Sequence, residues 1–292
     1  MFRKILVCVD PVPSNLNLLM CAASLKQVGA VEVVLAHILV CDAPGLEGML
    51  RNQARPELER QKKIIEKAGL EATFEMLVGY PARTLNDLAE SKDVSVIIMG
   101  THGRGLFESI TLAGSPLGNV SAKLLQITRR PVLLVPKALP AAETGEEASD
   151  LFAHVLFPTD FSDPAEVAFA YLETVVSAIH CPVTLLHVLP GSRSAPHPGN
   201  RLAKLQNLDQ NRLQRLKVWL ESRGASEVLI DHVQGAPGEE IVRKAEAGGC
   251  SLILMGTRGK GITGEILLGS VARHVARHAP RPVLFIPALN QS

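Results

Sequence analysis

The sequence lacks several features that would assign it at once to a broad class of protein. Its 30 basic and 29 acidic side chains leave a formal charge of +1, so it has no general attraction to nucleic acid or to an anionic membrane. No apolar run approaches the roughly 18 residues of a transmembrane helix, and the N-terminal segment reaches a charge too soon for a signal peptide. We therefore expect a cytoplasmic protein with no nucleic-acid or membrane partner.

Cysteine is sparse, and its arrangement argues against two further classes. The five cysteines are odd in number and never form a CxxC pair, which disfavours a disulfide framework or a zinc knuckle. His274 and His278 share a helix face and could ligate zinc, but each has an arginine beside it and the glutamate of HExxH is missing. We interpret that face as basic and solvated, and we expect no metal ligand and mostly buried cysteines.

Common catalytic and nucleotide motifs are also absent. There is no GxxxxGK[ST] and no G-x-S-x-G, which excludes a P-loop ATPase and gives no reason to expect a hydrolase. Residues 259–264 match GxGxxG, but no acidic residue follows about 20 positions later to bind a ribose, so we regard the match as chance. We expect no catalytic residue and at most slow ATP hydrolysis.

The strongest positive signal is an internal repeat. Asp10 and His37 recur as Asp160 and His187, and the triplet 99–101 recurs at 255–257 in the same order. The repeat predicts two domains, residues 1–137 and 151–292. Residues 138–150, rich in Ala, Pro and acidic side chains, suit a solvated linker.

Each copy contains five short β-rich runs, most of them continuously apolar and separated by helical stretches. This pattern predicts a parallel α/β sheet covered on both faces. Within 201–223, Leu residues and Trp219 recur at three- and four-residue steps, which predicts a helix packed on its own sheet. The runs span residues 4–10, 31–39, 72–79, 94–100 and 130–136, and then 154–160, 182–189, 227–235, 250–256 and 281–287.

A glycine-rich loop in the second copy follows its fourth run, where an open α/β sheet binds ligands. Gly256 and Gly259 allow tight turns and let N–H groups approach a ligand without Cβ obstruction. Arg258 and Lys260 add positive charge. Gly269 then precedes a helix whose N-terminus favours phosphate, with the Ser270 hydroxyl as cap or ligand. Such a loop alone could be a simple turn; together with Asp160 it predicts an anion site.

The spacing Gly256-x2-Gly259-x9-Gly269-Ser270, with FPTDFS at 157–162, LLHVLP at 185–190 and RPVLFIP at 281–287, resembles the universal stress protein family in its tandem form. The resemblance implies two doubly wound domains, each a five-stranded parallel sheet of order 3-2-1-4-5 flanked by helices. It also implies dimerisation through the fifth strands, which here would pair within the chain and remove exposed edges, with a further homodimer left open.

The resemblance further implies a stress-response regulatory protein that binds ATP, or ADP or AMP. Mg²⁺ could accompany the phosphates, with no protein ligand that we can name. The nucleotide-binding residues carried over include Thr159, Asp160 and Val188 at the adenine and ribose end and six residues around the phosphates. In full, the set is Pro158, Thr159, Asp160, Val188, Gly256, Arg258, Gly259, Gly269, Ser270 and Val271.

The first copy retains only part of this pattern, at Asp10, Gly100 and Gly103. Read backward from Pro131, its helix start is Gly118-Asn119, which makes the loop five residues longer than in the second copy. At about 3.3 Å per extended residue the insertion spans up to about 16 Å. We expect this degenerate site to bind nucleotide weakly or not at all.

Three interpretations stay open from the residues alone. His37 and His187 could lie beside the base or be hydrogen-bonded at their strand ends. The chain could be an assembly module that uses neither site. It could also be an adenylate-forming enzyme, although the SGG and HxGH motifs of such enzymes are absent.

Overall fold

The computed structural model describes residues 2–12, 15–41, 45–101, 117–137, 150–190, 199–259 and 268–288. Gly103, Lys260 and the linker residues 138–149 lie outside these ranges. Each of the ten predicted runs corresponds to one strand, with both ends within two residues of the prediction. The strands are β1 Lys4–Cys8, β2 Glu32–Leu39, β3 Glu71–Val78, β4 Val96–Gly100 and β5 Val132–Val135 in the first half, and β6 Val155–Pro158, β7 Val183–Pro190, β8 Val228–Gly235, β9 Leu252–Gly256 and β10 Val283–Ile286 in the second half.

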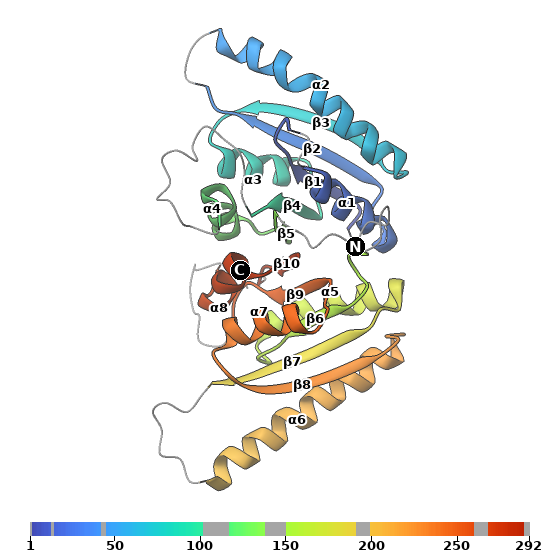
Figure 1. Cartoon of the computed structure of the whole chain (residues 1–292), viewed down its shortest axis with the longest axis vertical. Helices are drawn as coiled ribbons and strands as arrows, with labels where there is room; N and C mark the ends of the chain where they lie inside the picture. The colour runs from blue at the N-terminus through green and yellow to red at the C-terminus, as the bar shows by residue number, and fades with distance from the viewer. Residues whose placement is uncertain are drawn as a thin grey trace.

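The ten strands form one sheet in the order β3-β2-β1-β4-β5-β10-β9-β6-β7-β8 (Figure 1). Each half therefore has the predicted order 3-2-1-4-5, with parallel neighbours throughout. The two fifth strands pair antiparallel, with Val283 opposite Leu134 and Phe285 opposite Val132. The predicted fold and the predicted pairing inside the chain are confirmed.

Helices cover both faces of this sheet. They are α1 Leu16–Ser24, the 3-10 helix η2 Leu25–Val28, α2 Leu46–Lys67, α3 Pro81–Ser91, α4 Asn119–Ile127, α5 Asp163–Ile179, α6 Gly199–Ser222, α7 Pro237–Ala247 and α8 Ser270–His278. Side chains of α1, α2, α5 and α6 share one core with the sheet, and those of α3, α4, α7 and α8 share the other. Both cores run through β5 and β10, so the two halves share continuous apolar packing. No helix in the described part of the chain is both long and apolar enough to cross a bilayer.

The leucine stripe of α6 is only partly buried. Leu213 and Leu220 are fully buried, but Leu208 is 58% exposed and Trp219 is 47% exposed. The prediction that the whole leucine stripe packs on the sheet is therefore wrong for Leu208 and Trp219. The sheet covers fewer side chains of the helix than the apolar spacing predicts. Trp219 instead donates its indole N–H to Glu173 and lies under the Arg223 guanidinium.

Because β5 and β10 pair antiparallel, the strands of the two halves run in opposite directions where the halves meet. In each half the fifth strand runs parallel to its neighbours, whereas β5 and β10 run in opposite directions. The carboxyl ends of the second half's strands consequently share an edge of the sheet with the amino ends of the first half's strands.

Candidate functional site

The predicted site residues of the second half gather at the carboxyl ends of β6 and β9. These strands are parallel neighbours, with Leu156 opposite Ile253. Strand order reverses between them, since β6 leads outward to β7 and β9 leads to β10. Thr159 and Asp160 follow β6, and Thr257 to Gly259 follow β9, so the acidic residue and the glycine loop share the switch point at which open α/β sheets bind ligands.

Asp160 lies directly against the glycine loop. A Cβ added to Gly259 would fall 2.5 Å from Asp160 Oδ2, so only glycine allows the carboxylate to lie this close. The other oxygen, Oδ1, accepts hydrogen bonds from the Ser162 backbone N–H at 3.1 Å and the Ser162 hydroxyl at 2.5 Å. Ser162 precedes α5 but makes no side-chain cap to it, because its hydroxyl holds the Asp160 carboxylate.

Close packing also explains Gly256. A Cβ there would lie 2.9 Å from the backbone oxygen of Pro164, at the start of α5. Among the described glycines, neither Gly256 nor Gly259 has a φ in the left-handed region. The structure thus gives packing against Pro164 and Asp160 as the reason for glycine at these positions, and no left-handed turn at either; the predicted approach of a ligand to the loop stays a prediction.

The helix that should complete the site begins where the sequence predicts. The Gly269 N–H donates to Thr257 O at 2.7 Å and ties the start of α8 to the glycine loop. Gly269 occupies the N-cap position without a side-chain cap, and α8 begins at Ser270. The Ser270 hydroxyl is thus not a cap; the side chain is exposed, at a helix end that favours anions.

Arg258 lies between these elements and is half-buried. Its guanidinium Nη2 donates to the backbone oxygen of Ala288, just beyond β10, at 3.3 Å. This hydrogen bond holds the Arg258 side chain along the sheet edge, on the side toward the first half.

An aromatic and histidine cluster lies beside the other end of the site. His187 Nδ1 lies 2.7 Å from Thr159 O, and its Nε2 lies 3.5 Å from an Asp209 carboxylate oxygen. The Phe161 ring is 4.8 Å from the His187 ring and 5.3 Å from the Arg212 guanidinium carbon. Phe161 has a φ of 58°, a left-handed conformation that is uncommon for a bulky residue. These contacts show that His187 is hydrogen-bonded at its strand end.

Three members of this cluster were not foreseen from the sequence. Phe161 could have been, because it lies inside the FPTDFS motif. Asp209 and Arg212 could not, because they come from α6 and reach the site only through tertiary packing. A neighbouring histidine, His232, lies 5.4 Å from His187 between ring centroids; its pKa is lowered by burial first and by His187 second.

The first half repeats part of this geometry. The Gly118 N–H donates to Thr101 O at 2.7 Å, and α4 begins at Asn119, matching the start of α8. His37 Nδ1 lies 3.1 Å from Val9 O, matching His187. The segment between Thr101 and Gly118 is five residues longer than its counterpart between Thr257 and Gly269, as the backward alignment predicts.

The surroundings of Asp10 differ from those of Asp160. The fully buried Gln61 on α2 donates its amide to the backbone oxygens of Asp10 and Val12, at 3.1 and 3.2 Å. Asn15 donates to the Asp10 oxygen as well, at 2.5 Å. The loop after β1 is therefore held through its carbonyl groups by a helix side chain.

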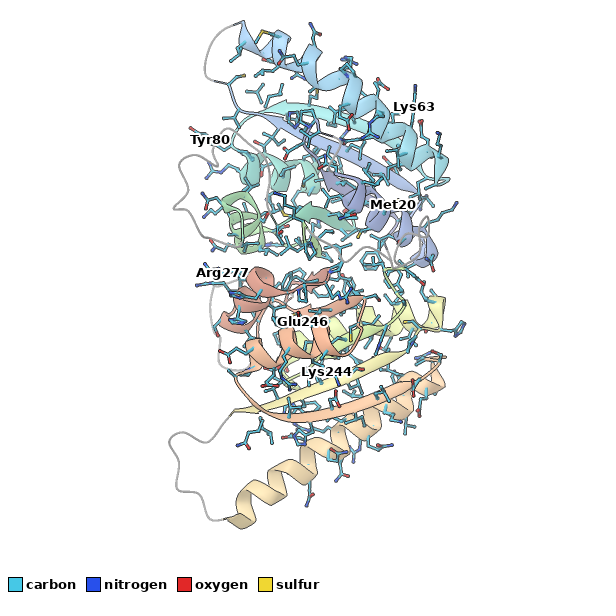
Figure 2. All side chains as sticks on the ribbon, in the orientation of Figure 1. Met20, Lys63, Tyr80, Lys244, Glu246 and Arg277 are labelled. Atoms are coloured by element: carbon cyan, nitrogen blue, oxygen red, sulfur yellow. The ribbon has the colours of Figure 1, made fainter. Side chains whose placement is uncertain are left out.

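The histidine pair of α8 matches its expected surroundings only in part. Arg277 of the same helix lies on the outer side of the molecule (Figure 2). His278 is exposed, whereas His274 is half-buried. Gly238 of α7 lies so close that a Cβ there would meet the His274 ring at 2.8 Å. No group of three or more His, Cys, Asp or Glu side chains within the described ranges could hold a metal ion.

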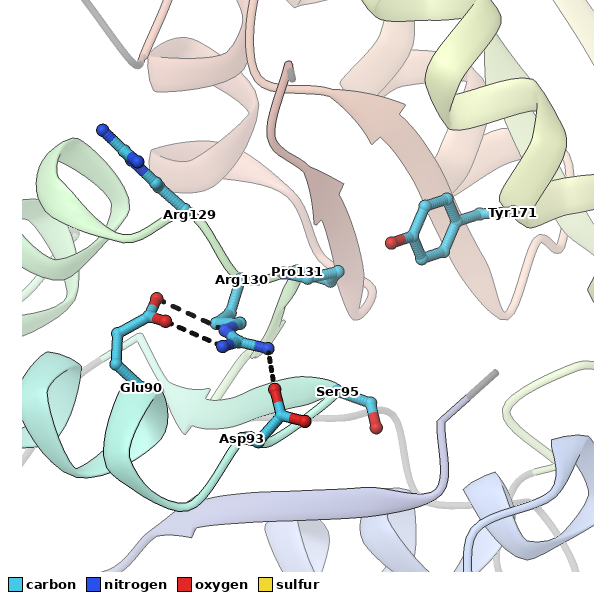
Figure 3. A pocket seen from close by; sticks show the side chains of 7 residues that line it. All are labelled: Glu90, Asp93, Ser95, Arg129, Arg130, Pro131 and Tyr171. Carbon is cyan, nitrogen blue, oxygen red and sulfur yellow. Dashed lines mark hydrogen bonds and ion pairs between the residues drawn. The ribbon is translucent and has the colours of Figure 1, made fainter. Parts of the chain in front are cut away.

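A cavity of about 450 Å³ lies between the halves. Arg130 pairs there with Glu90 at 2.7 Å and Asp93 at 2.9 Å (Figure 3). It also donates to Val94 O. Tyr171 of α5 faces the cavity from the second half (Figure 3). Its lining is Glu90, Asp93, Ser95, Arg129, Arg130, Pro131 and Tyr171, which includes none of the nucleotide-binding residues expected from the sequence.

Two 3-2-1-4-5 sheets joined through their fifth strands define a tandem doubly wound α/β protein. The chain belongs to the universal stress protein family, whose model matches residues 1–136 and again residues 152–287. Universal stress protein MJ0577 of Methanocaldococcus jannaschii is 33% identical over 161 residues, which cover 49% of this chain and 99% of that protein.

Two further similarities extend over most or all of the chain. Universal stress protein Rv2623 of Mycobacterium tuberculosis is 26% identical over 247 residues, 82% of this chain and 78% of that one. A crystal structure of a universal stress protein from Archaeoglobus fulgidus superimposes with a TM-score of 0.74 at 23% identity, covering 100% of this chain and 99% of that chain. This likeness supports the shared fold of the whole tandem unit.

Proposed function

We propose that this chain is a regulatory protein that binds an adenine nucleotide, ATP or else ADP or AMP, at the carboxyl edge of its second half. The observation that carries the proposal is the contact of Asp160 with Gly259, with 2.5 Å between the carboxylate oxygen and the position a Cβ would take. This contact brings a carboxylate that can accept hydrogen bonds from ribose hydroxyls next to a glycine loop that suits phosphates.

The chemistry of the surrounding groups fits a nucleotide. A carboxylate held by Ser162 accepts hydrogen bonds from ribose hydroxyl groups. The start of α8, tied to the loop through Gly269, offers backbone N–H groups and a positive dipole end, which contributes about 0.3–2 kcal/mol per anionic group. Arg258 adds a cation at the same edge, and several such donors together are required for useful affinity.

Mg²⁺ fits the proposal only as a companion of the phosphates. No carboxylate or histidine cluster in the described ranges could hold a metal ion, so the protein's part is to orient the phosphate oxygens. We assign no residue to catalysis, and nucleotide occupancy itself would change conformation or association.

The first half is proposed to bind nucleotide weakly or not at all. Its segment between Thr101 and α4 is five residues longer than the matching segment of the second half. The Gln61 amide also fixes the loop carbonyls beside Asp10. Both differences favour retention of the fold with a modified site.

Equilibrium dialysis of the mildly purified chain, with mass analysis of retained ligand, tests the proposal. We expect an adenine nucleotide, or uptake of added ATP with a Kd below about 1 mM, which corresponds to about −4 kcal/mol. A chain that retains no nucleotide and takes up no ATP at millimolar concentration contradicts the proposal.

A second candidate, an assembly module without a ligand, is supported by one observation. The fifth strands of the two halves, β5 and β10, pair inside the chain. The two halves therefore associate with each other without a ligand in either site. Replacing Ser270, an exposed residue at the α8 start, with a bulky Trp separates the two candidates. A stress phenotype lost while the melting temperature is kept supports nucleotide use, and a phenotype retained supports the assembly module.

A further inference from the structure

The first half brings a cationic residue to the edge on which the proposed nucleotide site of the second half lies. The antiparallel ladder pairs Val283 with Leu134 and Phe285 with Val132. The recorded ladder ends at Phe285 and Val132; if its register continued for three more residues, Ala288 would lie opposite Arg129. Opposite residues of an antiparallel pair have Cα atoms about 5 Å apart, so this continued register would bring Arg129 alongside the chain just beyond β10.

The other neighbour of Ala288 is the glycine loop. β9 and β10 are parallel, with Gly256 opposite Ile286, and the next step of that register sets Arg258 beside Ala288. The 3.3 Å hydrogen bond from Arg258 to Ala288 O confirms this adjacency. On the continued register, Arg129, Ala288 and Arg258 would lie in one row across the sheet edge, from the first half to the second.

Two adjacent arginines of the first half have different surroundings. The Arg130 guanidinium is occupied by Glu90, Asp93 and Val94 O. Arg129 is exposed, and it makes no hydrogen bond or ion pair with another residue of the described ranges. In Figure 3 its side chain points away from Arg130 and from Tyr171. Arg129 thus retains all its donors for a ligand.

The arrangement is not repeated for the first half. α4 ends at Ile127 and α8 at His278, and each is followed after three residues by Pro131 or Pro282. The position that matches Arg129 is therefore Pro280, which has neither charge nor N–H. The second half therefore has no arginine at the position that matches Arg129.

We infer that Arg129 is a positioning residue that acts across the junction and pairs with the terminal phosphate of a nucleotide in the second half. The inference rests on the proposed nucleotide site. Asp160 follows β6, which lies three strands from β5, or about 14 Å at the usual strand spacing. Three phosphate groups and the Arg129 side chain together can cover such a distance from a ribose at Asp160, and each phosphate that is removed shortens that reach. The guanidinium fork suits phosphate oxygens, so Arg129 favours ATP over AMP.

The test compares Arg129→Ala and Arg129→Lys with Arg215→Ala, a control that removes an exposed arginine from α6. Dissociation constants for ATP, ADP, AMP and adenosine are measured by calorimetry on the full chain, with melting temperatures to confirm folding. We expect Arg129→Ala to weaken ATP by about five- to tenfold and adenosine by less than about twofold. The lysine variant should keep part of the ATP affinity, the control should match the wild type, and added salt should reduce the difference.

The outcomes distinguish this inference from the proposed function on which it rests. If the wild-type chain binds ATP but Arg129→Ala leaves the ATP-to-AMP affinity ratio unchanged, the assignment of Arg129 is overturned and the nucleotide site stands. If the wild-type chain binds no nucleotide, both are overturned.

Discussion

The contact between Gly259 and Asp160 gives the sharpest prediction, because a single methyl group tests it. In Gly259→Ala the new Cβ would lie 2.5 Å from Asp160 Oδ2, whereas ordinary contact begins at 3.4 Å. The carboxylate must therefore withdraw by about 0.9 Å. We expect this movement to weaken the two hydrogen bonds that the carboxylate accepts from Ser162.

The expected loss of stability follows from the energies of those two hydrogen bonds. Loosening two hydrogen bonds to a half-exposed carboxylate costs about 1–2 kcal/mol, which lowers the melting temperature by about 2–4 °C per kcal/mol. Nucleotide affinity should fall by about tenfold, because the displaced carboxylate no longer meets the ribose and 1.4 kcal/mol equals one decade.

Two matched glycine variants control this experiment. Gly256→Ala would set a Cβ 2.9 Å from a backbone oxygen of Pro164, which cannot rotate aside, so we expect a larger stability loss of about 1–3 kcal/mol. Gly48→Ala on α2 meets nothing within 4 Å and should be neutral or stabilising by up to about 1 kcal/mol.

Calorimetric titration with ATP and thermal melting of the three variants provide the assay. The reasoning is refuted if Gly259→Ala retains both wild-type ATP affinity and wild-type melting temperature. It is also refuted if Gly256→Ala melts at the same temperature as Gly48→Ala, since the packing argument would then have no energetic consequence.

Three further predictions concern stability and reactivity. Arg130→Ala should lower the free energy of unfolding by about 1–2 kcal/mol, since it leaves Val94 O and two partly exposed carboxylates without their donor; urea unfolding that matches wild type would contradict this. Burial lowers the pKa of His154 below 6.5, so below that pH the unfolded chain binds more protons than the folded chain, and the free energy of unfolding should fall as the pH drops through that value. Melting temperatures at about pH 7.5 and pH 5.5 measure this fall, which should be smaller in His154→Gln. An equal fall in the variant and the wild type would contradict the prediction. Burial raises the pKa of Cys21 to about 12 and that of Cys181 to about 11, so both thiols should react with a maleimide only after denaturation; rapid labelling of either in the native chain would contradict their burial.

Much of the fold follows from local patterns in the sequence. Each apolar run contains a strand because a strand covered on both faces must be apolar throughout, and the repeat then fixes the same strand order in both halves. The pairing of β5 with β10 was predicted from the family resemblance, applied to the matching runs around Val132 and Val283. Its register was not, because it depends on how the two halves pack together.

The candidate site divides in the same way. Asp160 and the glycine loop could be predicted, because motif and chain order bring both to the carboxyl edge. The roles of Asp209 and Gln61 could not, since each comes from a helix distant in sequence whose rotation is set by core packing. The packing reason for Gly259 also needed three dimensions, because the side chain that excludes a Cβ lies 99 positions earlier in the chain.

The central claim is that one chain has one useful nucleotide site, in its second half. Its most direct test is calorimetric titration of ATP into the wild type, Asp160→Ala and the matched Asp10→Ala. The account predicts one site per chain that Asp160→Ala abolishes or weakens at least about tenfold and that Asp10→Ala leaves intact. Two equivalent sites per chain, equal losses in the two variants, or no binding to the wild type would contradict it.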